Sequence, residues 1–374
     1  MRAIVVDDAG GLESWESPWD DLAGTMSRPF CSPSWMLPWW HAEAPPGACL
    51  RAIVVVDQHG LLAIAPFFTH PDHGALTRYR LLASARGTPI EPLARPGQDH
   101  DAASAIVGQL GDLTPRPDLV TIEGATRDWA ERISRAWPGG LGSSFHRDRT
   151  ASAPVLDLTG RSFEEWFSSK SGSFQKKMRR SERKLRSAGY SPRVADSPDQ
   201  VGRGLAALSV HHLRRWDKRG GSRVWRPGTA AMLHEAEERL RSTGRFRLVT
   251  IDNGTDFISA HLFVAAGHHL SYWLGGFDEA WAEYSPGMVA LVAALRDAWQ
   301  QGYRRVDLGQ GLHSYKLRLA EGRQELEWLT LIPPGFSGVR TRLQLAPRRG
   351  ARALKRRLPD SVRDWARERL RRPG

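Results

Sequence analysis

The candidate chemistry of this chain begins at a turn that leads into a long helix. The segment Tyr284-Ser285-Pro286-Gly287 follows a β-rich run and precedes Met288 and an apolar pattern with a 3.6-residue period. The first amides of a helix have no acceptor within the helix, and the helix dipole is positive at that end. The turn therefore predicts an anion site suited to a phosphate or pyrophosphate, formed by Ser285, Pro286, Gly287 and Met288.

A second group of candidate residues lies on a strongly basic helix at residues 173–188, which Gly189 ends. Its apolar face is thin and Glu182 is its one acid. Like charges at helical spacing repel one another unless an anion is near, so the helix predicts a phosphate or nucleic-acid patch, with a solvated helix face as the alternative. The cations are Lys176, Lys177, Arg179, Arg180, Arg183, Lys184 and Arg186.

Metal-ligating patterns are weak in this sequence. His211 and His212 lie on an amphipathic stretch that also carries Trp216, but no acidic or cysteine partner stands at a metal-ligand spacing. We therefore predict no metal site and expect the histidines to pack or to form hydrogen bonds. The chain has two cysteines, which excludes a cysteine-rich zinc site, implies no disulfide framework and favours a reducing cytoplasm.

The elements that must position these groups follow from periodicity and turn signals. Three β-rich runs lie at residues 247–251, 258–264 and 269–274. The helix that starts at the Pro-Gly turn ends near Gly302, and a short strand at residues 306–309 leads into Gly311 and the pair Tyr315-Lys316. A helix between strands at this spacing is a crossover unit, so the second half is predicted to be α/β (α+β) with a mixed sheet.

The first half of the chain shows a similar alternation. Residues 30–42 predict an aromatic-rich helix, whose tryptophans we expect in a core rather than in a substrate wall. Residues 50–57 and 61–68 predict a β-hairpin, and residues 148–154 a domain boundary. The predicted organisation is an N-terminal domain at 1–150, a second domain at 151–336 and a basic tail at 337–374.

The net charge of +12 on 374 residues is concentrated in two places. Residues 340–374 hold thirteen Arg or Lys against three acids, which leaves only +2 for the rest of the chain, and the basic helix accounts for that remainder. Apolar positions in the tail predict two short basic amphipathic helices broken at Pro359. These would lie on an anionic membrane surface or on RNA, or pack across the domain with a solvated outer face.

Composition is that of an ordinary soluble globular protein, with 41% hydrophobic and 25% charged residues. The length favours about two domains. No run approaches the roughly 18 apolar residues that suggest a membrane helix. The first residues lack the pattern of a secretory signal, so we expect a cytoplasmic protein with peripheral membrane contact as an option.

The order of strands and helices resembles the GNAT superfamily of N-acetyltransferases, and more closely the branch named after the CelD/BcsL cellulose-biosynthesis proteins. The resemblance covers about residues 30–332 and implies two GNAT-like domains in tandem, as in the related Fem peptidyltransferases. It is carried by an ordered set of segments: residues 30–40, 64–66, 173–189, 272–278 (YWLGGFD), 285–287, 298–302, 307–311 and 315–316.

The reaction that the resemblance implies is direct attack of an amine on the carbonyl of an acyl donor. Lys316 resembles a lysine of Fem-like enzymes and is expected to stabilise the oxyanion. Asp307 or Asp278 would orient or deprotonate the amine, Tyr315 or Tyr272 would protonate the leaving group, and His261 and His313 are weaker base candidates. We also assign Gly309 and Gly311 to the donor site, and Trp216 and Trp273 to the acceptor pocket.

One departure bears on the donor. GNAT enzymes that use acetyl-CoA usually have Gln or Arg, two residues, Gly, one residue, and Gly or Ala at the pyrophosphate turn. Here Gly287 is present, but Tyr284 and Val289 stand at the outer positions. Fem-like enzymes also lack this motif and take an aminoacyl group from charged tRNA.

Three functions therefore stay open. We predict acyl-CoA as the donor, with aminoacyl-tRNA as the alternative and a non-catalytic scaffold that docks on an anionic membrane or a synthesis complex as the second alternative. Sugar, peptide, lipid and small natural-product amines all remain possible acceptors, which an interdomain cleft would bind. We expect a monomer.

Overall fold

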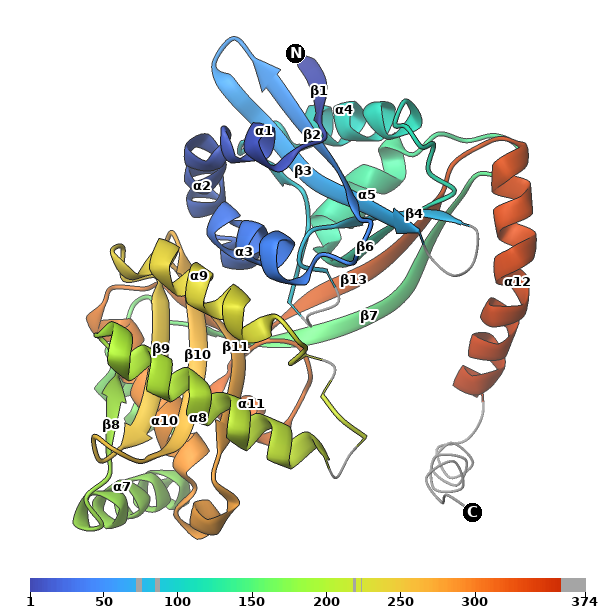
Figure 1. Cartoon of the computed structure of the whole chain (residues 1–374). Helices are drawn as coiled ribbons and strands as arrows, with labels where there is room; N and C mark the ends of the chain where they lie inside the picture. The colour runs from blue at the N-terminus through green and yellow to red at the C-terminus, as the bar shows by residue number, and fades with distance from the viewer. Residues whose placement is uncertain (72–75, 85–87, 218–219, 223, 358–374) are drawn as a thin grey trace.

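A single mixed sheet runs through both halves of the chain (Figure 1). The computed structural model describes residues 1–71, 76–84, 88–217, 220–222 and 224–357, and within them thirteen strands form this sheet. The strand order is β1-β2-β3-β4-β6-β13-β7-β12-β11-β10-β9-β8, with β5 beside β3. This arrangement confirms the predicted mixed α/β class.

The first half supplies one end of the sheet. Its strands are β1 (Arg2–Val6), β2 (Cys49–Asp57), β3 (Gly60–Pro71), β4 (Thr77–Leu81), β5 (Leu93–Ala94) and β6 (Leu119–Thr126). The predicted hairpin is β2 and β3, which pair antiparallel from Cys49↔Thr69 to Asp57↔Gly60. The helices are α1 (Ala9–Glu13), α2 (Glu16–Thr25), η1 (Pro29–Cys31), α3 (Pro33–Glu43), α4 (Asp99–Gly111) and α5 (Arg127–Ala136).

The second half supplies the other end. Its strands are β7 (Ser144–Asp157), β8 (Ser191–Val194), β9 (Phe246–Asp252), β10 (Phe257–Ala266), β11 (His269–Phe277), β12 (Arg305–Asp307) and β13 (Gly322–Ile332). The helices are α6 (Phe163–Ser169), α7 (Gly172–Ser187), α8 (Pro198–Asp217), α9 (Thr229–Arg241), η2 (Glu279–Tyr284), α10 (Pro286–Gln300), α11 (Ser314–Leu319) and α12 (Phe336–Arg357).

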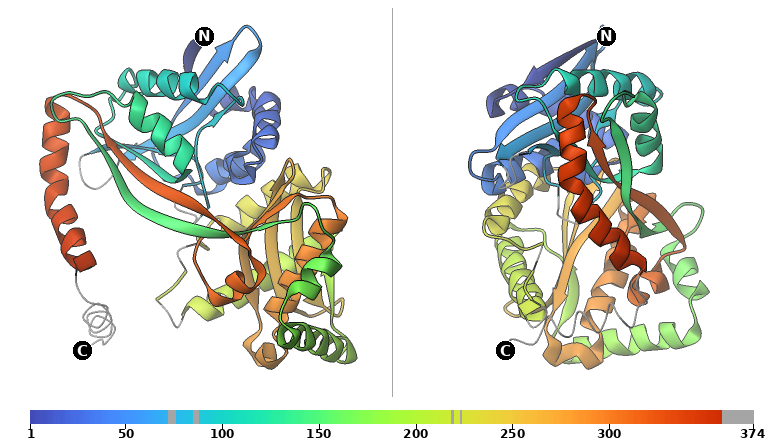
Figure 2. Two further views of the ribbon diagram at one scale, coloured as in Figure 1. Left: turned by 180° about the vertical axis from the view of Figure 1, so that it is seen from behind. Right: turned by 90° about the vertical axis from the view of Figure 1, so that its right-hand side faces the viewer.

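Two long strands, β7 and β13, join the halves (Figures 1 and 2). They pair with each other from Gly322↔Val155 to Ile332↔Ser144, while β13 also pairs with β6 and β7 with β12. Residues 148–154, where a domain boundary was predicted, therefore lie inside β7 and its hydrogen-bonded ladder.

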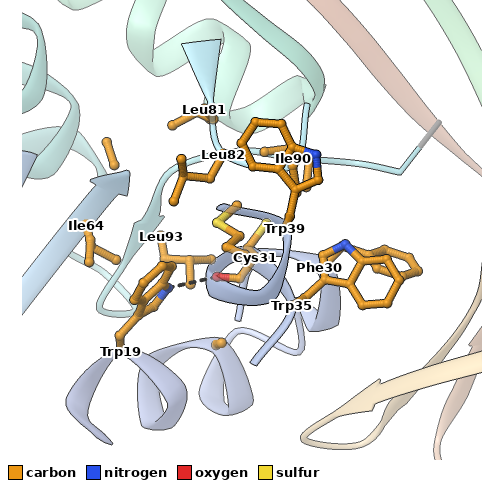
Figure 3. Close-up of a cluster of buried hydrophobic side chains, with 14 of the residues drawn as sticks. Trp19, Phe30, Cys31, Trp35, Trp39, Ile64, Leu81, Leu82, Ile90 and Leu93 are labelled. Carbon is orange, nitrogen blue, oxygen red and sulfur yellow. Dashed lines mark hydrogen bonds between the residues drawn. The ribbon is translucent and has the colours of Figure 1, made fainter. Parts of the chain in front are cut away.

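The first core confirms that the early tryptophans are structural. Trp19, Trp35 and Trp39 are buried, and the Trp19 indole Nε1 donates a hydrogen bond to the Cys31 carbonyl at 2.8 Å (Figure 3). The same core continues through Trp273 and helices α8 and α9. The two halves therefore share apolar packing in addition to the strand ladder.

The second core lies on the opposite face of strands β9–β12. Side chains alternate along a strand, so Leu248 faces α8 and α9 while Val249 faces α10. Helix α10 is buried along most of its length, with Val289, Leu291 and Leu295 in this core. Helices α6 and α7 pack beside α10, and Ser171 caps α7 by accepting a hydrogen bond from the Phe174 amide.

Helix α12 follows β13 and covers the part of the tail before Pro359, where the first of the two basic amphipathic helices was expected. Pro359 itself lies outside the described residues. Leu345 packs with Leu76, Leu119 and Ile332, which holds the first turns of α12 against the first half. Over the described residues, no helix has the length and apolar character needed to cross a membrane.

Candidate functional site

A split between two parallel strands forms the centre of the candidate site. β11 and β12 pair at only three positions, His269↔Arg305, Leu270↔Val306 and Ser271↔Asp307. Beyond Ser271, β11 continues beside β10 to Phe277, while the chain leaves β12 and turns at Gly309, whose φ is +73°. Ligands of α/β proteins bind where the carboxyl ends of neighbouring parallel strands diverge.

A β-bulge in β11 determines which side chains border this split. Phe263 pairs with Tyr272 but Leu262 pairs with Leu274, so Trp273 is an extra residue on β11. Without the bulge, Tyr272 and Gly275 would lie on opposite faces of the sheet. With it, both lie on the face that carries His261 and packs under α10.

Lys316 closes one side of the split. Its side chain is only 6% exposed, and Nζ donates hydrogen bonds to the carbonyls of Gly309 (3.1 Å) and Gln310 (2.9 Å). The ammonium lies 5.7 Å from the centre of the Tyr272 ring. Burial lowers the pKa of Lys316 to about 8, and the Asp307 carboxylate partly opposes this shift. Two of the three ammonium hydrogens are used, so one can point to an incoming group.

Tyr272 and Tyr315 join β11 to α11 through a hydrogen bond between their side chains. Burial raises the pKa of both phenols, that of Tyr272 well above its ordinary value. Both side chains are therefore neutral at physiological pH and act as hydroxyl donors and acceptors. His313 stacks on Tyr315, with ring centres 5.8 Å apart.

The His261 ring stacks on Tyr272, with ring centres 5.8 Å apart. It is 5% exposed, and neither ring nitrogen has a hydrogen-bond partner among the described residues. Burial, assisted by the charge of Arg215, lowers its pKa to about 3, so the imidazole is neutral. A Cβ on Gly275 would lie 2.1 Å from His261 Nδ1 and 2.4 Å from the Tyr272 hydroxyl, so this position requires glycine.

The two candidate aspartates lie far apart. Asp307 ends β12 beside the split, where its Oδ1 accepts a hydrogen bond from the Gly309 amide at 2.7 Å and burial raises its pKa. Asp278 follows the far end of β11 and caps η2 by accepting from the Ala280 amide at 3.0 Å. Asp278 instead borders a cleft of about 310 Å³ that is also lined by Arg214, Arg215 and Phe277.

Most backbone amides at the start of α10 already donate hydrogen bonds within the turn. The Ser285 amide donates to the Ala282 carbonyl, and the Met288 and Val289 amides donate to Ser285 at 3.0 and 3.1 Å. Pro286 has no N–H, so within this fully described turn only the Gly287 amide lacks a hydrogen-bond acceptor. Gly287 is buried against Phe277 and His261. The turn therefore offers fewer donors to a phosphate than a helix start normally does.

The basic face of α7 is exposed and adjoins this turn. Lys184 Nζ lies 5.1 Å from the centre of the Tyr284 ring, just before α10 begins. Arg186 pairs with Glu182 at 2.9 Å, and Arg179 lies over the Phe167 ring. Within the described part of the chain, no ion pair is formed by Lys176, Lys177, Arg180 or Arg183.

The two tryptophans predicted for an acceptor pocket are the exposed and buried members of one aromatic row. Trp216 is 39% exposed and contacts His212, whose ring in turn contacts Trp225. Trp225 contacts Trp273, which packs edge-on against Trp35 in the shared core. Their role in acceptor binding stays a prediction.

Sequence reasoning missed Arg215, Gly275 and the pair Arg28 and Arg305. Arg215 lies on α8, yet its charge acts on His261, Tyr272 and Tyr315, all of which come later in the chain. Of these missed residues, Gly275 alone had a sequence signal, because it is the first glycine of the YWLGGFD motif. Among the described residues, no group of three or more His, Cys, Asp or Glu is arranged to hold a metal ion.

Comparison with known proteins bears on the domain type and the fold. Residues 172–317 match the family model described as "Acetyltransferase (GNAT) domain". No curated protein matches the chain. The crystal structure of FemX is similar with a TM-score of 0.59 at 11% identity, covering 89% of this chain and 97% of that chain.

Two further solved structures share the fold. A conserved protein of unknown function from Bacteroides thetaiotaomicron has a TM-score of 0.55 at 11% identity, covering 88% of this chain and 100% of that one. The C-terminal domain (DUF2156) of a putative lysylphosphatidylglycerol synthetase from Agrobacterium fabrum has a TM-score of 0.50 at 12% identity, covering 74% and 82%. The chain thus contains a GNAT acyltransferase domain. Its overall fold is Fem-like, as the resemblance predicted.

Proposed function

We propose that this protein is an N-acyltransferase that moves an acyl group from a thioester or ester donor to an amine by direct attack. The observation that carries the proposal is the split between β11 and β12, with the Lys316 ammonium on one side and the hydrogen-bonded Tyr272 and Tyr315 on the other. A buried cation and neutral hydroxyl donors at the point where two parallel strands diverge suit a carbonyl that becomes an oxyanion.

In this mechanism the amine nitrogen attacks the donor carbonyl within the split. A C–N bond forms, and the carbonyl oxygen becomes an oxyanion that the third Lys316 hydrogen stabilises. Asp307 accepts the proton that the amine loses. Collapse of the intermediate breaks the bond to the leaving sulfur or oxygen, which takes a proton from Tyr315. Tyr315 is then reprotonated from solvent, and Asp307 releases its proton to solvent. The products are an amide and the free thiol or alcohol.

The donor we favour is acyl-CoA, in keeping with the GNAT domain. Its phosphates would lie near the Gly287 amide and the Lys184 ammonium, which flank the turn before α10. The test is thermal melting with millimolar CoA, which stabilises a protein that binds it. We expect a higher Tm for the wild type and for Gly202→Leu, whose site on α8 is open, and no change for Gly287→Leu. Absence of any shift in the wild type contradicts acyl-CoA as donor.

Aminoacyl-tRNA is the second candidate donor, because of the free cations on α7. Four of them have no ion pair among the described residues, and the face reaches the α10 turn through Lys184. The turn itself keeps most amides for its own hydrogen bonds, which disfavours a pyrophosphate there. A transfer assay with charged tRNA and acetyl-CoA in parallel decides between the two donors.

A further inference from the structure

A small cavity of about 30 Å³ lies between the two halves, and Asp307 connects it to the split. Residues paired across β11 and β12 share a face, so His269, Ser271, Arg305 and Asp307 all line this cavity. Leu270 and Val306, which lie between them, face the second core instead. Arg28 enters the cavity from the first half, beside η1.

The guanidiniums of Arg28 and Arg305 line this cavity together with one carboxylate, that of Asp307. Arg28 pairs with Glu91 at 2.6 Å, but Arg305 donates only to the neutral Gln324 Oε1, at 2.5 Å. Over the described residues Arg305 forms no ion pair; burial lowers its pKa, as does the Arg28 charge, while the Asp307 and Asp157 carboxylates raise it. His269 is neutral because burial lowers its pKa to about 4. A half-buried guanidinium with unused donors calls for an anion.

Asp307 offers a site for a cation beside this anion site. Its Oδ1 accepts the Gly309 amide, which leaves Oδ2 for another donor. Arg305 and Asp307 are two residues apart on one strand, so their Cα atoms are about 6.6 Å apart. That spacing suits one small molecule with an amine at Asp307 and a carboxylate at Arg305.

We infer that this cavity is the carboxylate subsite of the acceptor, and that the acceptor carries its reactive amine close to a carboxylate. Arg305 and Arg28 bind the carboxylate, and Asp307 binds the amine at the edge of the split. The acceptor class is an α-amino acid, free or as part of a larger molecule. The role of this subsite in acceptor binding rests on the proposed acyl transfer. Binding itself is measured without a donor, so the two proposals are tested separately.

The test is thermal melting with three probes at millimolar concentration and constant ionic strength. Glycine offers an amine and a carboxylate, glycinamide only the amine, and acetate only the carboxylate. The variant is Arg305→Gln and the matched control is Arg304→Gln, an exposed arginine next to it. Arg305→Lys keeps the charge, and circular dichroism checks that each variant is folded.

We expect glycine to stabilise the wild type and Arg304→Gln, acetate to do so less, and glycinamide to have no effect. Arg305→Gln should weaken glycine binding about tenfold or more, and Arg305→Lys less, since a point charge replaces a planar fork. If Arg305→Gln does not fold, the assignment is tested by Arg305→Lys, whose affinity for glycine should be lower than that of the wild type.

Equal responses to glycine and glycinamide, an unchanged affinity in Arg305→Gln, or no response of the wild type to glycine each overturn the assignment. Glycine binding that depends on Arg305, together with no acyl transfer from any donor, rejects the proposed function while the subsite stands. Transfer to amines that lack a carboxylate, with no glycine binding, supports the proposed function and rejects the subsite. For a free amino acid, glycine must also serve as an acceptor, whereas glycine binding combined with transfer to other amines but not to glycine indicates a larger acceptor.

Discussion

Ser271 and Asp307 are the last residues at which β11 and β12 pair, and the two strands separate beyond this pair. Their pairing fixes the two faces of the split. Tyr272 and His261 lie on the face under α10, and Asp307 and Arg305 on the face toward the first half. The donor and the acceptor are thereby assigned to opposite faces of the sheet.

Lys316→Ala should lower kcat by about 10²–10³-fold, the usual loss when one oxyanion donor is removed. The matched control is Lys177→Ala, an exposed lysine on α7, which should leave turnover with a small donor unchanged. Thiol release from the donor measures both. Turnover of Lys316→Ala within a few-fold of the wild type contradicts the assigned role.

The activity of the wild type should fall as the pH rises through about 8, because the folded protein loses the Lys316 charge there. Lys316→Arg stays charged and should keep its residual activity to higher pH. The stability effect has the opposite sign. Between about pH 8 and the ordinary lysine pKa the unfolded chain binds more protons, so Lys316 makes stability rise with pH in this window. Rate profiles and denaturant unfolding at matched pH values check the two effects separately.

Gly275→Ala should destabilise the protein by about 1–3 kcal/mol and abolish transfer, since the added methyl meets His261 and the Tyr272 hydroxyl. Gly202→Ala is the control, because its site on α8 is open, and it should stabilise by about 0.5–1 kcal/mol. Combining Gly275→Ala with His261→Ala should recover part of the stability. Urea unfolding of the wild type, Gly202→Ala, Gly275→Ala, His261→Ala and the double variant measures these values. Additive effects of Gly275→Ala and His261→Ala would argue against direct contact.

His261 should reduce stability in acid. Its folded pKa of about 3 lies below the ordinary value, so between about pH 6.5 and 3 the unfolded chain binds the extra proton. Stability then falls by up to about 1.4 kcal/mol per pH unit in that window. His212 and His269 contribute in the same direction. His261→Gln should therefore lose less stability than the wild type from pH 6.5 to 4.5, whereas the exposed His234→Gln should behave as the wild type.

The α7 face should bind tRNA only if aminoacyl-tRNA is the donor. In that case the double variant Lys177→Gln, Arg180→Gln should bind tRNA more weakly. The slope of log K against log salt concentration should fall by the amount expected for the loss of about two phosphate contacts. Arg2→Gln with Arg116→Gln removes two exposed cations from the first half and serves as the control. Equal losses in the two double variants, measured by filter binding over a salt series, would indicate a non-specific charge effect.

Much of the second half could be predicted from local patterns. The three β-rich runs became β9, β10 and β11, and the apolar period after Pro286 became α10, because alternation and a 3.6-residue repeat are local properties of the chain. The start of α6 carries a local signal as well, because Ser162 and Glu165 form a capping box there. The candidate residues Lys316, Asp307, Tyr272 and Tyr315 were found through the family resemblance and its ordered motifs, and the structure brings all four to one split.

Only the tertiary structure decided how these parts meet. The pairing of β13 with both β6 and β7 joins residues almost two hundred positions apart, and it turned the expected boundary into a shared ladder. The bulge at Trp273 put Tyr272 and Gly275 on one face, and strand pairing placed Arg305 beside Arg28 in one cavity. Such contacts depend on strand order and register, which are set by packing across the whole chain and leave no periodic signal in the sequence.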